Sequence, residues 1–203
     1  MKEKPLHQIR AVHDARTVRV YQAYNDSIAD AALQRGTFVS PPFSLTRMTW
    51  IKPSFLWMVY RAGWGFKDAG QNRILALDIT REGFDWALDH ACLSHPPEGM
   101  GEADWEAMKA SHPVRIQWDP ERDLHHNPLP HRAIQIGLRD EAVARYVNDW
   151  IVGVTDVTAF AHEIHALVKA GRLDEAEALL PVETPYLLDP AGETGRRLKV
   201  SQD

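Results

Sequence analysis

The chain has 203 residues, large for one domain and small for two, with 25% charged and 44% hydrophobic residues, as in an ordinary globular protein. A formal net charge of −5 argues against a protein that coats nucleic acid without sequence preference, but it is compatible with a local basic pocket. Cys92 is the only cysteine, which excludes an internal disulfide and a cysteine-based zinc site and favours a reducing, cytoplasmic location. We expect no secretory signal in MKEKPLHQIR and no membrane span, because no apolar run of about 18 residues occurs.

The first predicted element is a strand from Thr17 to Asn25. Its alternation places Arg19 and Tyr21 on one face, and Gln22 with two valines on the other. An arginine and a glutamine in an otherwise apolar strand need polar partners when they are buried. We expect an anionic ligand to be such a partner.

Capping and breaking residues define the next elements. Asn25 or its neighbours cap a helix that stops at Gly36, and Pro53 is the expected first residue of a helix that Gly63 ends. Two adjacent prolines make residues 39–47 a loop. The elements that follow are a strand over 73–79 buried on both faces, a helix from Thr80 to about Cys92, a loop over 93–104 and a short helix that ends before Pro113.

The second half predicts a hairpin and then helices. Residues 114–119 and 132–138 read as strands joined by a polar connection, so we expect an antiparallel pair. A helix over 140–148, a short apolar strand over 150–154 and helices over 155–170 and 173–180 follow. Strands and helices do not alternate regularly, which disfavours a doubly wound sheet. We therefore predict a single α+β domain over 1–190, with a mixed, mostly antiparallel split sheet flanked by helices. Residues 191–203 are predicted to form a polar tail.

Histidine-rich segments do not predict a metal site. In FAHEIHAL, His162 and His165 are three residues apart, whereas the zinc motif of metalloproteases needs a spacing of about four. We interpret this segment as a solvated helix face. His125 and His126 lie near His131 but have no cysteine to complete a zinc site. Glycine-rich phosphate loops and the G-x-S-x-G elbow are absent from the sequence.

The segment RMTWIKPSFLWMVYRAGWG, residues 47–65, combines aromatic and basic side chains. Trp57 and Arg61 share one face of the predicted helix. Two interpretations remain open: an aromatic helix that packs on the sheet, or one wall of a site for a flat anion. If the protein has a ligand site, we expect the two flanks of the segment, residues 47–52 and 61–64, to face that site. These flanks carry Trp50, Trp64 and the cations Arg47, Lys52 and Arg61.

QWDPER, residues 117–122, carries charged side chains where a predicted strand ends. Strand ends next to irregular loops often display functional groups. Glu121 or Asp119 beside Arg122 could act as a base or hold a ribose hydroxyl. The alternative is a surface turn in which Arg122 pairs with Asp119 at little net energy.

VRVYQAYN, RMTWIKPSFLWMVYRAGWG, QWDPER and RAIQIGL, in this order, resemble a bacterial and fungal family catalogued as domain of unknown function 4291. The resemblance covers about residues 10 to 170 and implies no activity. A more distant resemblance is to ADP-ribosyltransferase-like domains, small α+β folds with a split sheet. That resemblance implies catalytic roles for Arg19 on the first strand and for Glu121, which would hold the nicotinamide ribose of NAD. The middle motif of those domains has no clear counterpart here; Tyr60 is the nearest candidate.

The resulting hypothesis is an ADP-ribosyltransferase-like transferase that uses NAD or another nucleotide, with an anion pocket lined by arginine and tryptophan. The alternatives are a non-catalytic module that binds single-stranded nucleic acid or a nucleotide end, and a protein in which the aromatic segment is purely structural. Convergence of Arg19, Lys52, Arg61 and Glu121 on one open pocket would favour the first. The predicted ligand contacts are Arg19, Tyr21, Gln22, Arg47, Trp50, Lys52, Trp57, Arg61, Gln117, Asp119 and Arg122, besides Glu121.

Overall fold

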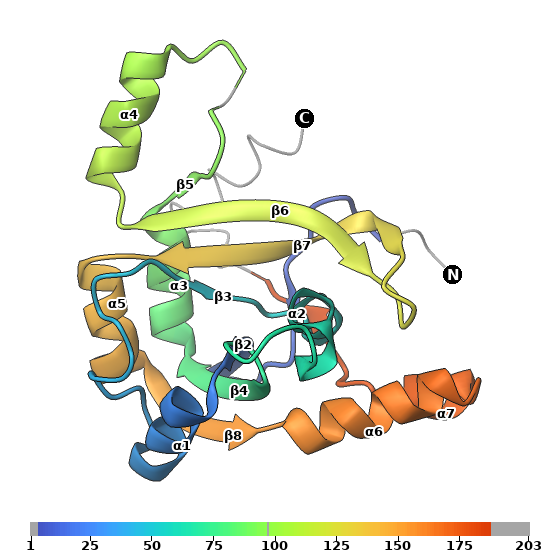
Figure 1. The fold of residues 1–203 in the computed structure, drawn as a ribbon. Helices are drawn as coiled ribbons and strands as arrows, with labels where there is room; N and C mark the ends of the chain where they lie inside the picture. The colour runs from blue at the N-terminus through green and yellow to red at the C-terminus, as the bar shows by residue number, and fades with distance from the viewer. Residues whose placement is uncertain (1–3, 97, 188–203) are drawn as a thin grey trace.

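Two sheets form the centre of the fold, shown in Figure 1 for a computed structural model that describes residues 4–96 and 98–187. The predicted polar tail over 191–203 lies outside these residues. One sheet has the order β2 (Thr17–Tyr24), β4 (Arg73–Thr80), β8 (Ile151–Asp156). The other has the order β3 (Thr49–Ile51), β7 (Pro128–Leu138), β6 (Val114–Arg122), β5 (Ala91–Leu93). All neighbouring strands in these sheets are antiparallel except β5 and β6.

A single bridge joins the two sheets. The backbone N–H of Tyr21 donates to the carbonyl of Lys52 at 2.7 Å, and the N–H of Lys52 donates back at 3.3 Å. A separate short pair, β1 (Arg10–Ala11) and β9 (Thr184–Pro185), brings the two ends of the described chain together. The predicted single α+β domain with a split, mostly antiparallel sheet is therefore confirmed.

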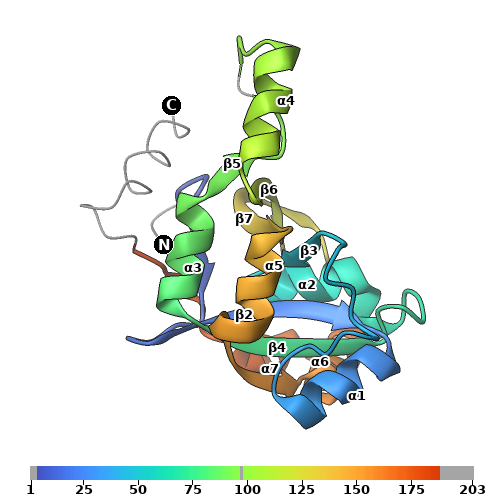
Figure 2. The same cartoon turned by 90° about the vertical axis from the view of Figure 1, so that its left-hand side faces the viewer.

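The helices begin and end largely where capping residues predict. Asn25 caps α1 by accepting the N–H of Ile28 at 3.0 Å, and Gly36 and Gly63 adopt left-handed conformations after α1 and α2. Figure 2 shows α4 standing out from the rest of the fold beside β5. No helix in the described part of the chain is long and apolar enough to cross a membrane. The helices are α1 (Asp26–Arg35), α2 (Phe55–Ala62), α3 (Arg81–Asp89), α4 (Glu102–Ser111), α5 (Glu141–Arg145), α6 (Thr158–Lys169) and α7 (Leu173–Leu179).

Two apolar clusters hold these elements together. The larger one includes Val20, Leu77 and Ile136 and lies between the two sheets, α3 and α5. The smaller one includes Tyr21 and Phe55 and lies between β2, β4, α2 and α6. Strand β4 contributes alternate side chains to both clusters, which confirms the prediction that it is buried on both faces.

In the first half of the chain two predicted helix boundaries differ and one strand was not predicted. The helix predicted to reach Cys92 ends at Asp89, because Ala91–Leu93 pair in parallel with β6 as β5. Strand β3 was not predicted, and it pairs with β7 at the edge of the four-stranded sheet. Pro53 is not the first residue of α2: Ser54 caps the helix, which begins at Phe55.

The short strand predicted over 150–154 is confirmed as β8, but the boundaries of the helices on either side of it differ. The helix predicted from residue 155 begins at Thr158. The pairing of β8 with β4 extends to Asp156, whose carboxylate then accepts the N–H of Thr158 at 2.8 Å and so starts α6. The helix predicted over 140–148 changes to a π-helical turn over Tyr146–Trp150, which lies beside α3.

Candidate functional site

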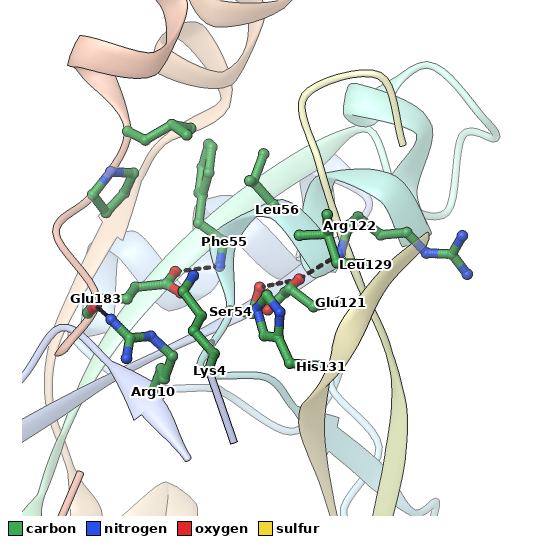
Figure 3. Close-up of a pocket in the computed structure, with 12 residues that line it drawn as sticks. Lys4, Arg10, Ser54, Phe55, Leu56, Glu121, Arg122, Leu129, His131 and Glu183 are labelled. Carbon is green, nitrogen blue, oxygen red and sulfur yellow. Dashed lines mark hydrogen bonds between the residues drawn. The ribbon is translucent and has the colours of Figure 1, made fainter. Parts of the chain in front are cut away.

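A pocket of about 170 Å³ opens at the N-terminal end of α2, where segments far apart in the sequence meet (Figure 3). Apolar walls come from Phe55, Leu56, Leu129, Leu180 and Pro181. The polar lining consists of Lys4, Arg10, Ser54, Glu121, Arg122, His131 and Glu183.

Glu121 lies at the end of β6, where the pairing with β7 becomes irregular after Pro120. Its Oε1 accepts a hydrogen bond from the Ser54 hydroxyl at 2.9 Å and another from the backbone N–H of Arg122 at 2.8 Å. These donors are a hydroxyl and an amide rather than a cation. Burial raises the pKa of Glu121, and the two hydrogen bonds oppose that rise only in part.

Glu183 is a second carboxyl group in the same pocket. Its Oε1 accepts the backbone N–H of Phe55 at 2.7 Å, and Arg10 fixes its backbone by donating to its carbonyl at 2.8 Å. Burial raises its pKa to about 8, and the nearby charge of Glu121 adds to the rise. Glu183 was not predicted, because no motif surrounds it and long-range contacts, among them the β1–β9 pairing, bring it to α2.

Cations line the same pocket. The charges of Lys4 and Arg10 lower the pKa of Glu183 and partly offset its burial. Burial and the charges of Lys4 and Arg10 also lower the pKa of His131. Two carboxyl groups with different donors can divide into an acid and a base, which is the usual basis for acid–base roles in a pocket.

Arg122 lines the pocket but does not aim its charge into it. Figure 3 shows its guanidinium directed away from the two carboxyl groups. The guanidinium lies 3.9 Å from the centre of the Tyr60 ring and donates to the carbonyl of His126 at 3.3 Å. The proposed surface pair of Arg122 with Asp119 does not form in the described residues, since the Asp119 carboxylate accepts from the amides of Gln117 and Gln135.

Six predicted ligand contacts do not line the pocket; they lie on or beside the face of the four-stranded sheet opposite the larger apolar cluster, here called the outer face. In the strand register, Trp50 lies opposite Gly137 and Gln117 opposite Gln135. A Cβ at Gly137 would come within 3.0 Å of the Trp50 ring, so the glycine lets the indole lie across the strand. The six are Trp50, Lys52, Gln117 and Asp119, with Trp57 and Arg61 from α2.

Lys52 is the buried cation of this group, with 7% of its surface exposed. Its Nζ donates to the carbonyl of Trp50 at 3.1 Å and lies 6.0 Å from the centre of the Trp57 ring. Burial and then the charge of Arg61 lower the pKa of Lys52 to about 7, whereas Asp119 acts in the opposite sense. Lys52, Trp57 and Arg61 are therefore neighbours, as the sequence suggested.

The other predicted contacts have partners within the protein. Arg19 forms a two-pronged ion pair with Asp78, at 2.8 and 2.9 Å, so the expectation that its partner is a ligand is corrected. The missing signal was the pairing of β2 with β4, which places Asp78 opposite Arg19. The structure does not bring Arg19, Lys52, Arg61 and Glu121 to one pocket.

Tyr21, Gln22 and Arg47 also lie apart from the pocket lining. The Tyr21 ring packs edge-on against Phe55 at 5.5 Å in the smaller cluster. Gln22 is 2% exposed, donates to the Thr49 hydroxyl at 2.7 Å and accepts the Tyr146 hydroxyl at 2.7 Å. Arg47 is exposed in the loop before β3.

The histidines on α6 lie on a partly exposed face, as expected, but they stack on aromatic rings and are not fully solvated. His162 stacks on Phe66 at 4.3 Å, and Trp64 stacks between His165 and His126 at 5.2 and 5.1 Å. Among residues 4–96 and 98–187, no group of three or more histidine, cysteine, aspartate or glutamate side chains is arranged to hold a metal ion.

Comparison with known families gives one match. The model of a family described as a domain of unknown function (DUF4291) matches residues 8–186. This range contains Arg10, Ser54, Glu121, His131 and Glu183. A search of curated proteins found no match to the chain.

Proposed function

The chain belongs to the family of the domain of unknown function 4291. We propose from the pocket that it is a transferase acting on the ribose of NAD or a related nucleotide. The observation that carries the proposal is the pair of half-buried carboxyl groups, Glu121 and Glu183, in one pocket lined by Lys4, Arg10 and His131. A cytoplasmic location is part of the proposal.

The two carboxyl groups suit different tasks. In its ionised form Glu121 can accept a hydrogen bond from a ribose hydroxyl and stabilise the positive charge that develops on the sugar as the base leaves. Glu183, with a pKa of about 8, is mostly protonated at pH 7 and can donate a hydrogen bond to a second oxygen. Lys4 and Arg10 supply positive charge for a phosphate.

The size of the pocket limits what enters it. A volume of about 170 Å³ is close to that of an engineered cavity of roughly 150 Å³ that holds one benzene ring. The pocket therefore suits one ring of a nucleotide, and the phosphates and the second nucleoside of NAD would lie outside it. Such a pocket suits an enzyme that acts on the ribose and binds the rest of the nucleotide at the edge of the pocket.

Release of nicotinamide from NAD tests the proposal. We expect Glu121→Gln to lower the rate by roughly a hundredfold or more, in line with the loss of a group that stabilises charge in the transition state. Glu183→Gln should also lower it, and Glu163→Gln, a matched change at an exposed position on α6, should leave it unchanged. Unaltered release in the Glu121 and Glu183 variants, or none by the wild type at millimolar NAD, would reject the proposal.

The outer face of the four-stranded sheet supports a second candidate, the binding of single-stranded nucleic acid or a nucleotide end. Trp50 lies half-buried across Gly137, and Lys52, Trp57 and Arg61 lie beside one another. Aromatic rings together with cations are the common means of binding single strands. Affinity for a thymidine oligonucleotide should fall steeply with salt and on Trp50→Ala. Equal affinity of the wild type and this variant would remove the candidate.

A further inference from the structure

Ser54 is a pocket residue that no function above uses. Its hydroxyl donates to Oε1 of Glu121 at 2.9 Å and lines the pocket, although only 4% of the residue is exposed. We propose that Ser54 is a nucleophile activated by Glu121, and that it takes up a group covalently from an electrophile held in the pocket. The identity of the natural electrophile, the anomeric carbon of a ribose, rests on the proposed function.

The arrangement meets the usual requirements for an activated hydroxyl. A nucleophile needs a base within hydrogen-bond reach, and the base needs a third group to orient it. Glu121 is within reach, and the backbone N–H of Arg122 holds the same carboxylate oxygen at 2.8 Å. Ser54 also accepts the N–H of Trp57 at 3.1 Å, which fixes its oxygen and leaves one lone pair for attack.

Ser27 and Thr17 lack this combination. Ser27, in the first turn of α1, is exposed and donates to the side-chain amide oxygen of Asn25 at 2.9 Å. An amide oxygen does not take a proton near neutral pH, so Ser27 is a natural internal control. Thr17 donates to the carboxylate of Asp14 at 3.2 Å, but on the exposed surface, where no pocket holds an electrophile.

The reaction balances without an outside oxidant or reductant. With a nucleotide, Oγ of Ser54 bonds to the anomeric carbon, the bond from that carbon to the base breaks, and the base leaves with the electron pair. The hydroxyl proton passes to Glu121. With a sulfonyl fluoride, the oxygen bonds to sulfur, fluoride leaves, and the proton again passes to Glu121.

Methanesulfonyl fluoride, a reagent small enough for the pocket, tests the nucleophile without a nucleotide. After reaction of the full chain, peptide mass spectrometry should find the sulfonyl group on Ser54 at least tenfold faster than on Ser27. Glu121→Gln should slow labelling of Ser54 by at least tenfold. The rate on Ser54 should also rise with pH as Glu121 ionises, above the usual range of a carboxyl group.

Ser54→Asn is the matched variant, because asparagine retains a good helix cap but has no hydroxyl. It should fold, bear no label at position 54 and leave labelling of Ser27 unchanged. Labelling of Ser54 no faster than of Ser27, or a rate unaffected by Glu121→Gln, would overturn the inference.

A parallel incubation with NAD separates this inference from the proposed function. Both are supported if nicotinamide is released and Ser54 acquires an ADP-ribosyl mass. Nicotinamide release without sulfonylation of Ser54 supports the transferase and overturns the nucleophile. Sulfonylation of Ser54 without nicotinamide release supports the nucleophile and rejects the nucleotide as its substrate.

Discussion

Glu183, which is half-buried, and Lys52, which is buried, both have pKa values shifted toward the neutral form of the group. Each is disfavoured in its ionised form, Glu183 with a pKa raised to about 8 and Lys52 with a pKa lowered to about 7. Perturbed groups of this kind concentrate at functional sites. Glu183 lies in the pocket, and Lys52 beside the aromatic face, so both candidate sites contain one.

Replacement of Glu183 by glutamine should change how stability depends on pH. The unfolded chain releases this proton near its ordinary pKa of 4.5 and the folded protein near 8, so the free energy of unfolding falls as the pH rises between these values. Each unit of pKa difference corresponds to about 1.4 kcal/mol. In urea unfolding at pH 5 and 8.5, Glu183→Gln should raise stability at pH 8.5 by roughly 2–4 kcal/mol, an order-of-magnitude value. A pH dependence equal to that of the wild type would contradict this.

Replacement of Lys52 by methionine should raise the stability of the protein at low pH. The folded protein releases the Lys52 proton near pH 7 and the unfolded chain near 10.5, so stability rises between pH 7 and 10.5 and the full cost of burial is present below pH 7. The variant should therefore be more stable than the wild type at pH 6, by roughly 1–3 kcal/mol, and about equal at pH 10.5. Lys169→Met, at an exposed position on α6, should show no such gain. A loss of stability at pH 6 in the Lys52 variant would count against this cause.

At the scale of elements, the strongest local signals were caps and breakers. Asn25, Gly36, Gly63 and Thr80 ended or began helices where the sequence predicted. Short strands were missed because two or three residues, as in β1, β3, β5 and β9, show no periodicity; only their partners make them strands. The π-helical turn over Tyr146–Trp150 was not predicted, because it depends on packing against α3, which lies far away in the sequence.

The contact of α3 with this turn depends on Gly83. A Cβ at Gly83 would lie 2.3 Å from Cγ of Trp150, which is 5% exposed. Gly83→Ala should therefore lower the free energy of unfolding by about 1–3 kcal/mol through overpacking. Gly153→Ala is the control, since its Cβ would lie 3.6 Å from the nearest atom, an ordinary contact. Equal stabilities of the two variants, measured by urea unfolding, would show that α3 and the turn shift apart at little cost.

At the scale of the whole molecule, the pocket exists because distant segments are fastened together. Tyr186 anchors the segment that carries Glu183: its ring packs against Phe84 at 5.0 Å and its hydroxyl donates to Asp85 at 2.6 Å. Glu121 was predicted from a motif on one strand, whereas Glu183 depends on this long-range anchoring. Local patterns in the sequence could therefore indicate only half of the carboxyl pair.

Tyr186→Ala should release this segment. The loss of a buried ring costs about 3–5 kcal/mol, and the N–H of Phe55 should exchange faster with solvent because its acceptor is Glu183. Tyr186→Phe keeps the ring, loses one hydrogen bond at a cost of about 1 kcal/mol, and should leave that exchange nearly unchanged. Hydrogen exchange followed by mass spectrometry measures both. Equal protection of Phe55 in Tyr186→Ala and the wild type would show that Glu183 is held by other contacts.

Calorimetric titration of NAD into the wild type and into Glu121→Gln, both at pH 7, tests the central claim most directly. If the pocket receives the ribose, the wild type should bind with a saturable heat, and Glu121→Gln should bind at least tenfold more weakly, because a neutral amide oxygen replaces the charged carboxylate that accepts the ribose hydroxyl. Equal affinities, or no binding by the wild type at millimolar NAD, would contradict the account.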